Sequence, residues 1–147
     1  MYSPGKIIYF DPFHFKDGSS KPKYFLVLKI FNGNAILASL PSSKFHLPQN
    51  QSIKHGCLEI KDACISCYIF EAKVPITKTG WFFELNTFLY AQWVDEFIIE
   101  ELSNHYPLSG IDYEIIGELK DDELKKIIQC FYNSNVIKRK YKRILTI

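Results

Sequence analysis

Apolar residues in the first third of the chain occur in short runs separated by polar turns. The runs GKIIYFD (5–11), YFLVLKIF (24–31) and NAILASLP (34–41) have the length and the β-branched or aromatic content of strands. Asn32-Gly33 separates the second run from the third, and both residues tolerate the positive φ angles of a type I′ turn. The pattern therefore predicts a β-meander at the start of the chain.

Further strands are predicted after a polar, loop-like stretch that follows Pro41. The segments CLEI (57–60) and ACISCYIFEAKV (63–74) favour strands. NTFLYAQWVDEF (86–97) fits either a strand or the start of a helix, and we expect a strand followed by a short helix. DYEIIGEL (112–119) is a further strand candidate.

The segment DDELKKIIQCFYNSN predicts an amphipathic helix. Leu124, Ile127, Ile128 and Phe131 follow the spacing of one helix face, and acidic residues occupy the first turn. Many short strands followed by one helix favour a mainly β fold with α-helix, a small barrel with the helix packed on it. We expect a single domain with three parts. They are a barrel over 1–119, an inserted loop and strand region at 44–86 within it, and a C-terminal helix with a basic tail over 120–147.

Composition agrees with one globular domain. The chain has 147 residues, of which 47% are hydrophobic, and this is enough to build a single core. The first residues lack the pattern of a signal peptide, and no apolar stretch reaches membrane-spanning length. The sequence therefore predicts a cytoplasmic protein without a membrane partner.

The four cysteines, Cys57, Cys64, Cys67 and Cys130, are expected to be reduced, because they are few and unevenly spaced in a chain that can build its own core. Together with His55, three of them offer a ligand set of the kind that tetrahedral zinc prefers. The spacing does not form two paired knuckles, and a strand would send Cys64 and Cys67 to opposite faces. Buried free cysteine is the favoured interpretation, and no metal site is assigned.

Charge is unevenly distributed along the chain. Lys138, Arg139, Lys140, Lys142 and Arg143 supply 5 of the 18 basic residues, so the rest of the chain holds 13 basic against 16 acidic residues. The rest of the chain therefore has a small net negative charge, which argues against nonspecific nucleic-acid binding over the whole surface. The basic end, with Tyr141 among its cations, fits either a solubilising helix end or a contact with RNA or an acidic partner.

Polar groups that can act on a phosphodiester gather at one end of the predicted meander. Lys23 lies just before one predicted strand, and Ser42 lies just after the next. If these two strands are hairpin partners, their ends away from the Asn32-Gly33 turn lie side by side. Imidazole, ammonium and hydroxyl groups placed in this way can bind a phosphate and move protons. A polar loop end without catalytic function is the alternative interpretation. The residues concerned are His14, Lys21, Lys23, Ser42, Ser43 and His46.

Several short motifs occur in a recognisable order along the chain. The opening strand GKIIYF is followed by Asp11-Pro12, by the basic-proline step of KPKYFLVL and by the hydroxyl pair of LPSS. Near the end, IIGELKDDELKKII has the form of a G-x-L-x-x-E-E-L helix entry. This order resembles the MazF/PemK family of toxin–antitoxin ribonucleases, over the start and the last third of the chain.

The resemblance implies a Src-homology-3-like barrel with helices that cleaves single-stranded RNA without a metal or other cofactor, the ribose 2′-hydroxyl attacking the adjacent phosphate. It also implies a homodimer that an antitoxin protein neutralises. By position, the catalytic candidates are Lys23, Lys21, Ser42, Ser43 and His14. The RNA-binding candidates are Lys16, Lys44, His46 and Gln92.

The chain departs from the family pattern in the length of the stretch from Ser43 to Asn86 and at two expected functional groups. The usual cation of the family is arginine, which holds a phosphate by two bonds, and this chain has no arginine before Arg139. Ala91 also stands before Gln92, where many members have an acid. These departures leave two alternatives open. One is a catalytically inactive barrel that binds RNA or a protein, and the other is a protein-targeting toxin that resembles CcdB.

Overall fold

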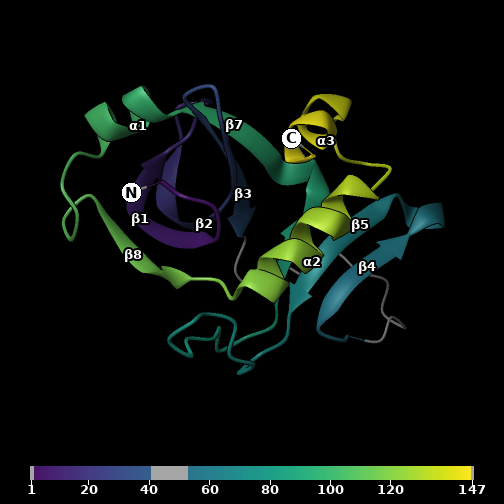
Figure 1. Cartoon of the computed structure of the whole chain (residues 1–147). Helices are drawn as coiled ribbons and strands as arrows, with labels where there is room; N and C mark the ends of the chain where they lie inside the picture. Colours follow the sequence, from purple (N-terminus) through teal and green to yellow (C-terminus); the bar gives the residue numbers. More distant parts are fainter. Residues whose placement is uncertain (1, 41–52, 147) are drawn as a thin grey trace.

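The computed structural model of the chain describes residues 2–40 and 53–146. In this part of the chain, eight β-strands and three α-helices follow one another (Figure 1). The strands are β1 (Lys6–His14), β2 (Ser20–Phe31), β3 (Asn34–Leu40), β4 (Gly56–Ile60), β5 (Ile65–Phe70), β6 (Thr87–Tyr90), β7 (Val94–Ile98) and β8 (Tyr113–Glu118). The helices are α1 (Ile99–His105), α2 (Asp121–Tyr132) and α3 (Arg139–Leu145). All strand pairs are antiparallel, so the prediction of a mainly β fold with helices is confirmed.

Five strands form the larger sheet in the order β7-β3-β2-β1-β8. The predicted meander is confirmed: β2 and β3 pair across Asn32 and Gly33, whose φ angles are 49° and 77°. The predicted start of β2 at Tyr24 is wrong, because β1 extends to His14 and its partner strand therefore begins at Ser20. Lys21 and Lys23 consequently lie within the strand and not at a loop before it.

The larger sheet is buried on both faces. On one face, residues such as Phe10, Phe25 and Val27 form a cluster with Leu102 and Tyr106, which belong to α1 and the position that follows it. The other face packs against the smaller sheet, α2 and α3. Figure 1 shows the larger sheet and α1 on one side of the molecule and the smaller sheet with α2 and α3 on the other. Among the described residues β7 and β8 are the edges of the larger sheet and do not pair with each other.

The smaller sheet has the order β4-β5-β6 and carries α2 on one face (Figure 1). The predicted helix is confirmed; Ile127 and Phe131 are buried, and three acidic residues lie in its first turn. The predicted strand and short helix at 86–106 are also present, but a 3-10 turn (Ala91–Trp93) divides that segment into β6 and β7 before α1 begins.

The prediction that all four cysteines are reduced is wrong for two of them. Cys57 on β4 and Cys130 on α2 form a disulfide, and their Cα atoms are 5.6 Å apart. The two positions are 73 residues apart in sequence and meet only because α2 packs across the smaller sheet, so spacing along the chain cannot indicate the pair. Cys64 and Cys67 are free, the first exposed and the second buried.

The basic end of the chain is a packed helix. Tyr141, Ile144 and Leu145 of α3 are buried against the core that lies between the two sheets. Tyr141 is only 3% exposed, so its ring is not accessible for stacking on RNA bases. None of the helices in residues 2–40 and 53–146 has the length and apolar character that crossing a membrane requires.

Candidate functional site

A pocket of about 590 Å³ opens where the end of the β1–β2 hairpin meets β7 and α1. Its volume lies within the range of ligand-binding pockets in proteins. Aromatic and aliphatic side chains form the walls, and imidazole, ammonium, amide and carboxylate groups are also part of the lining. The lining residues are Phe13, His14, Phe15, Lys16, Asn34, Glu96, Phe97, Ile98, Glu101, Leu102, His105 and Tyr106.

Tyr106 holds the end of the hairpin against α1. Its hydroxyl accepts a hydrogen bond from the backbone N–H of His14 at 2.8 Å. The His14 ring also lies 6.3 Å from the Tyr106 ring, nearly parallel to it, between centroids. Phe13 packs on the same tyrosine with a centroid distance of 5.4 Å. Tyr106 therefore holds the backbone of His14 and the ring of Phe13 at the pocket.

A second imidazole lies at the same tyrosine. The ring centroid of His105, the last residue of α1, is also 6.3 Å from that of Tyr106, and the two planes are almost perpendicular. Glu101 is four residues before His105, so both side chains project from one face of the helix. His14, His105 and Glu101 are exposed to solvent. The pocket thus brings together two imidazoles and a carboxylate that solvent and a substrate can reach.

Lys16 lies at the pocket with its charge already paired. Its Nζ donates to Asp95 Oδ2 at 3.1 Å and to the carbonyl oxygen of Glu96 at 3.3 Å. It also lies 4.7 Å from the centroid of the Phe97 ring, within cation–π distance. The ion pair is solvent-exposed, so it contributes little stability and can be broken by a competing anion.

Asp95 and Glu96 connect the pocket to the C-terminal helix. Tyr141 donates its hydroxyl hydrogen to Asp95 Oδ1 at 3.0 Å, and Lys140 forms an ion pair with Glu96, which also accepts from Asn34. Desolvation raises the pKa of Asp95, but hydrogen bonds from Lys16, the Glu96 N–H and Tyr141 outweigh it and leave the pKa below its usual value. Hydrogen bonds from Lys140 and Asn34 lower the pKa of Glu96. Both carboxylates therefore favour the ionised form.

The structure brings some of the predicted site residues together. His14 and Lys16 line the pocket, and the Nζ of Lys21 lies 5.6 Å from the ring centroid of Phe15, another lining residue. Lys23 pairs with Phe10, two positions further along β2, about 6.6 Å from Lys21 at the usual rise of a strand. Gln92 is exposed in the 3-10 turn and is not part of the pocket lining. Four predicted residues, Ser42, Ser43, Lys44 and His46, lie outside the described residues.

Sequence reasoning missed three residues of the pocket. His105, Glu101 and Tyr106 were not among the predicted site residues. The segment IIEELSNHY does carry a signal, because a Glu and a His four residues apart lie on the same face once the segment is helical. His14 is far from this segment in sequence, so the sequence does not indicate that this helix face lies next to the β1–β2 hairpin. Within residues 2–40 and 53–146 no three His, Cys, Asp or Glu side chains are grouped so as to hold a metal ion.

Comparisons of the chain with protein-family models, with curated proteins and with solved structures find no match. The geometry of the pocket and the motif order are therefore the grounds on which a function can be argued.

Proposed function

We propose that the protein is an endoribonuclease, similar to the MazF/PemK toxins, that cleaves single-stranded RNA at the pocket between the β1–β2 hairpin and α1. The observation that carries the proposal is the placement of His14 and His105, whose rings both lie 6.3 Å from that of Tyr106 at one pocket. Two imidazoles at one site supply the base and the acid that phosphodiester cleavage requires.

The reaction proceeds by transfer of protons without a metal ion. One imidazole accepts the proton of the ribose 2′-hydroxyl while that oxygen bonds to the adjacent phosphorus. The bond from phosphorus to the 5′-oxygen breaks, and the second imidazole protonates the leaving oxygen. The products are a 2′,3′-cyclic phosphate and a free 5′-hydroxyl. Lys16 and Lys21, which lie at Phe97 and Phe15, supply positive charge next to the phosphate.

The walls of the pocket support RNA as the ligand. Phe15 and Phe97, which are partly exposed, provide aromatic faces, and bases of single-stranded RNA stack on such faces without a strict sequence requirement. Base stacking on aromatic rings combined with nearby cations is the usual way in which proteins hold single strands. A base held in this way would place its ribose next to the imidazoles.

The proposal extends to the fold and the partners. The strand order β7-β3-β2-β1-β8 and the apolar cluster enclosed with α1 support a small barrel of the Src-homology-3 type. By the same resemblance, we propose a homodimer that an antitoxin protein neutralises.

A second candidate function is a binding module without catalysis. Lys16 is paired with Asp95, and Glu96 and Glu101 add carboxylates to the lining. Negative charge at the pocket opposes the approach of a phosphate. In this alternative the pocket binds a neutral or cationic ligand, and the imidazoles do not transfer protons.

Incubation of the purified protein with a long single-stranded RNA in the presence of a chelator tests the proposal. Discrete fragments with 2′,3′-cyclic phosphate ends are expected. RNA that binds but stays intact would exclude the cleavage reaction, and RNA that neither binds nor breaks would favour a pocket that takes a neutral or cationic ligand.

A further inference from the structure

The disulfide joins Cys57 and Cys130, two residues that differ strongly in their exposure to solvent. Cys57 lies on β4 and is exposed, whereas Cys130 is 5% exposed on the inner face of α2. A thiolate can attack only a sulfur that it can reach. Attack on this bond from solvent is therefore directed to Cys57.

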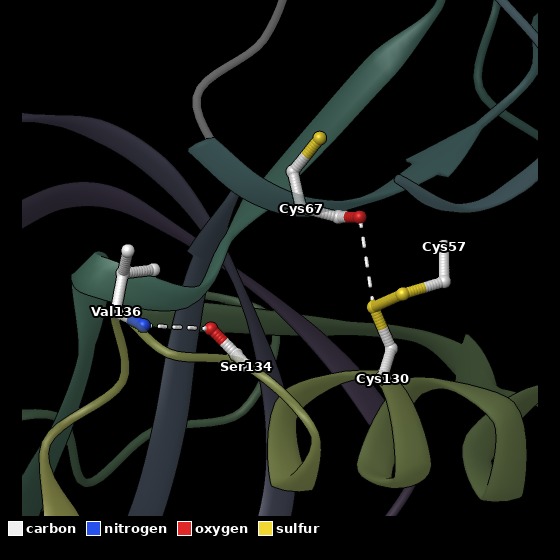
Figure 2. Close-up of a disulfide and its surroundings, with 5 residues drawn as sticks. All are labelled: Cys57, Cys67, Cys130, Ser134 and Val136. Carbon is white, nitrogen blue, oxygen red and sulfur yellow. Dashed lines mark hydrogen bonds between the residues drawn. A yellow bond between two sulfur atoms is a disulfide. The ribbon is translucent and has the colours of Figure 1, made fainter. Parts of the chain in front are cut away.

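The environment of Cys130 suits the reduced state as well as the oxidised one. Figure 2 shows the backbone carbonyl of Cys67 directed at Cys130, while the Cys67 side chain points away from the disulfide. The Cys130 Sγ lies 3.6 Å from that carbonyl oxygen. Once the disulfide is open, the Cys130 thiol has an acceptor for its hydrogen without any rearrangement.

Helix α2 is also held to the smaller sheet by groups other than the disulfide. Glu123, in the first turn of α2, accepts a hydrogen bond from the Tyr68 hydroxyl at 3.0 Å and is paired with His55 Nε2. His55 Nδ1 accepts from the Glu71 backbone N–H at 3.1 Å, so Nε2 carries the hydrogen that Glu123 accepts. Opening the disulfide therefore leaves α2 in place.

From these three features we propose that Cys57 is a thiol–disulfide exchange site, at which a low-molecular-weight thiol such as glutathione reversibly opens the Cys57–Cys130 bond. The proposal is independent of the activity at the pocket. It gives the pair a role in a reducing compartment, where a permanently closed disulfide is uncommon.

The exchange is a balanced two-electron reaction. The small thiolate bonds to Cys57 Sγ, the bond between the two cysteine sulfurs breaks, and its electron pair leaves with Cys130 Sγ, which takes up a proton. A second small thiol then attacks the mixed disulfide and releases Cys57 as a thiol. The two small thiols leave joined as their disulfide. Overall, two electrons and two protons pass to the cysteine pair.

Exposed Cys64 would also react with glutathione disulfide, so the test is made in a Cys64→Ser background. The folded protein is equilibrated with mixtures of reduced and oxidised glutathione, quenched with acid, and analysed by peptide mass spectrometry and near-ultraviolet circular dichroism. We expect one glutathione on the peptide that contains Cys57, none on that of Cys130, and full reduction without loss of the folded signal. A disulfide that opens only in denaturant, or an adduct divided equally between both cysteines, would overturn the proposal.

Two matched variants, both made in the Cys64→Ser background, test whether exposure to solvent decides which cysteine reacts. Cys130→Ser leaves Cys57 exposed and should take up one glutathione per chain. Cys57→Ser leaves Cys130 buried and should take up none while folded. Equal labelling of the two folded variants would contradict the proposed site. If either variant does not fold, the adduct position in the disulfide-containing Cys64→Ser protein decides the question alone.

Discussion

The hydroxyl of Tyr106 accepts a hydrogen bond from the backbone N–H of His14 at 2.8 Å, across 92 positions of sequence. This bond joins the residue after α1 to the last residue of β1. It holds one predicted catalytic residue against the helix that carries the second imidazole. The geometry of the pocket thus depends on a contact between two segments whose proximity no local sequence pattern reveals.

Tyr106→Phe should therefore destabilise the fold by about 1 kcal/mol, because the His14 N–H loses its acceptor. Tyr2→Phe is the matched control. Both tyrosines belong to the same apolar cluster, but the Tyr2 hydroxyl is buried without a hydrogen-bond partner among the described residues. Its removal should be neutral or stabilising. Denaturant unfolding of the two variants measures the difference, and equal losses of stability would refute this role of Tyr106.

The free energy of unfolding should fall at acidic pH, partly because Asp95 becomes protonated. Its pKa in the folded state lies below the ordinary value of 3.8, so ionised Asp95 stabilises the fold above that pH. This contribution is lost as the pH falls through the folded-state pKa. Asp95→Asn should show a shallower fall in unfolding free energy below about pH 4. Tyr141→Phe, which removes one donor to Asp95, should lie between the variant and the unaltered protein. If the free energy of unfolding falls with pH in the same way for all three proteins, this role of Asp95 is contradicted.

The disulfide should contribute substantially to equilibrium stability even though it can be opened. Closing a loop of 73 residues restricts the unfolded chain, and removal of such a cross-link costs about 2–4 kcal/mol. The double variant Cys57→Ser with Cys130→Ser should lose this amount in denaturant unfolding. Cys64→Ser, at an exposed free cysteine, should change stability by less than about 0.5 kcal/mol. A double variant as stable as the control would be the contrary result.

The C-terminal helix should matter for stability and not for RNA binding. A chain that ends at Asn135 loses the buried side chains Tyr141, Ile144 and Leu145 and should unfold more easily, since large apolar side chains each contribute about 1.5–3 kcal/mol on burial. Truncation is thus a poor test of the basic end. Substitution of exposed Arg139 and Arg143 by Ser keeps the buried face of α3.

This arginine variant should bind RNA with unchanged affinity and salt dependence, whereas Lys16→Ala should weaken binding and reduce the salt slope by about 1. Fluorescence anisotropy with a labelled single strand measures both quantities. Loss of affinity in the arginine variant, with Lys16→Ala unaffected, would move the RNA contact from the pocket to α3.

Local patterns in the sequence predicted the mainly β character of the fold and several of its elements. The Asn32-Gly33 turn and the apolar periodicity from Leu124 to Phe131 act within a few residues, so the hairpin and α2 were found. The early start of β2 was missed because pairing with β1 decides it, and the residues of that segment are typical turn formers. Element boundaries that depend on a distant partner strand are not encoded in local propensity.

The candidate site was predictable only in part, for the same reason. His14 was a candidate because of its place at the polar end of the predicted meander, and Lys16 was a candidate through the family resemblance; the structure places both at the pocket. His105 joins them through the packing of α1 on the larger sheet, and Cys57 meets Cys130 through the packing of α2 on the smaller one. Both relationships are tertiary. The cations of the hairpin were expected to be available for phosphate, yet Lys16 is paired with Asp95, a partner 79 positions away.

The most direct test of the central claim is the rate of single-stranded RNA cleavage in chelator by the unaltered protein and by His14→Ala and His105→Ala. Both histidines are exposed, so neither substitution should disturb folding. Each variant should cleave about 100-fold more slowly, while Lys54→Ala, at an exposed residue that precedes β4, should cleave at the normal rate. Cleavage that survives in both histidine variants, or RNA that the unaltered protein leaves intact, would contradict the assignment of this pocket as a ribonuclease site.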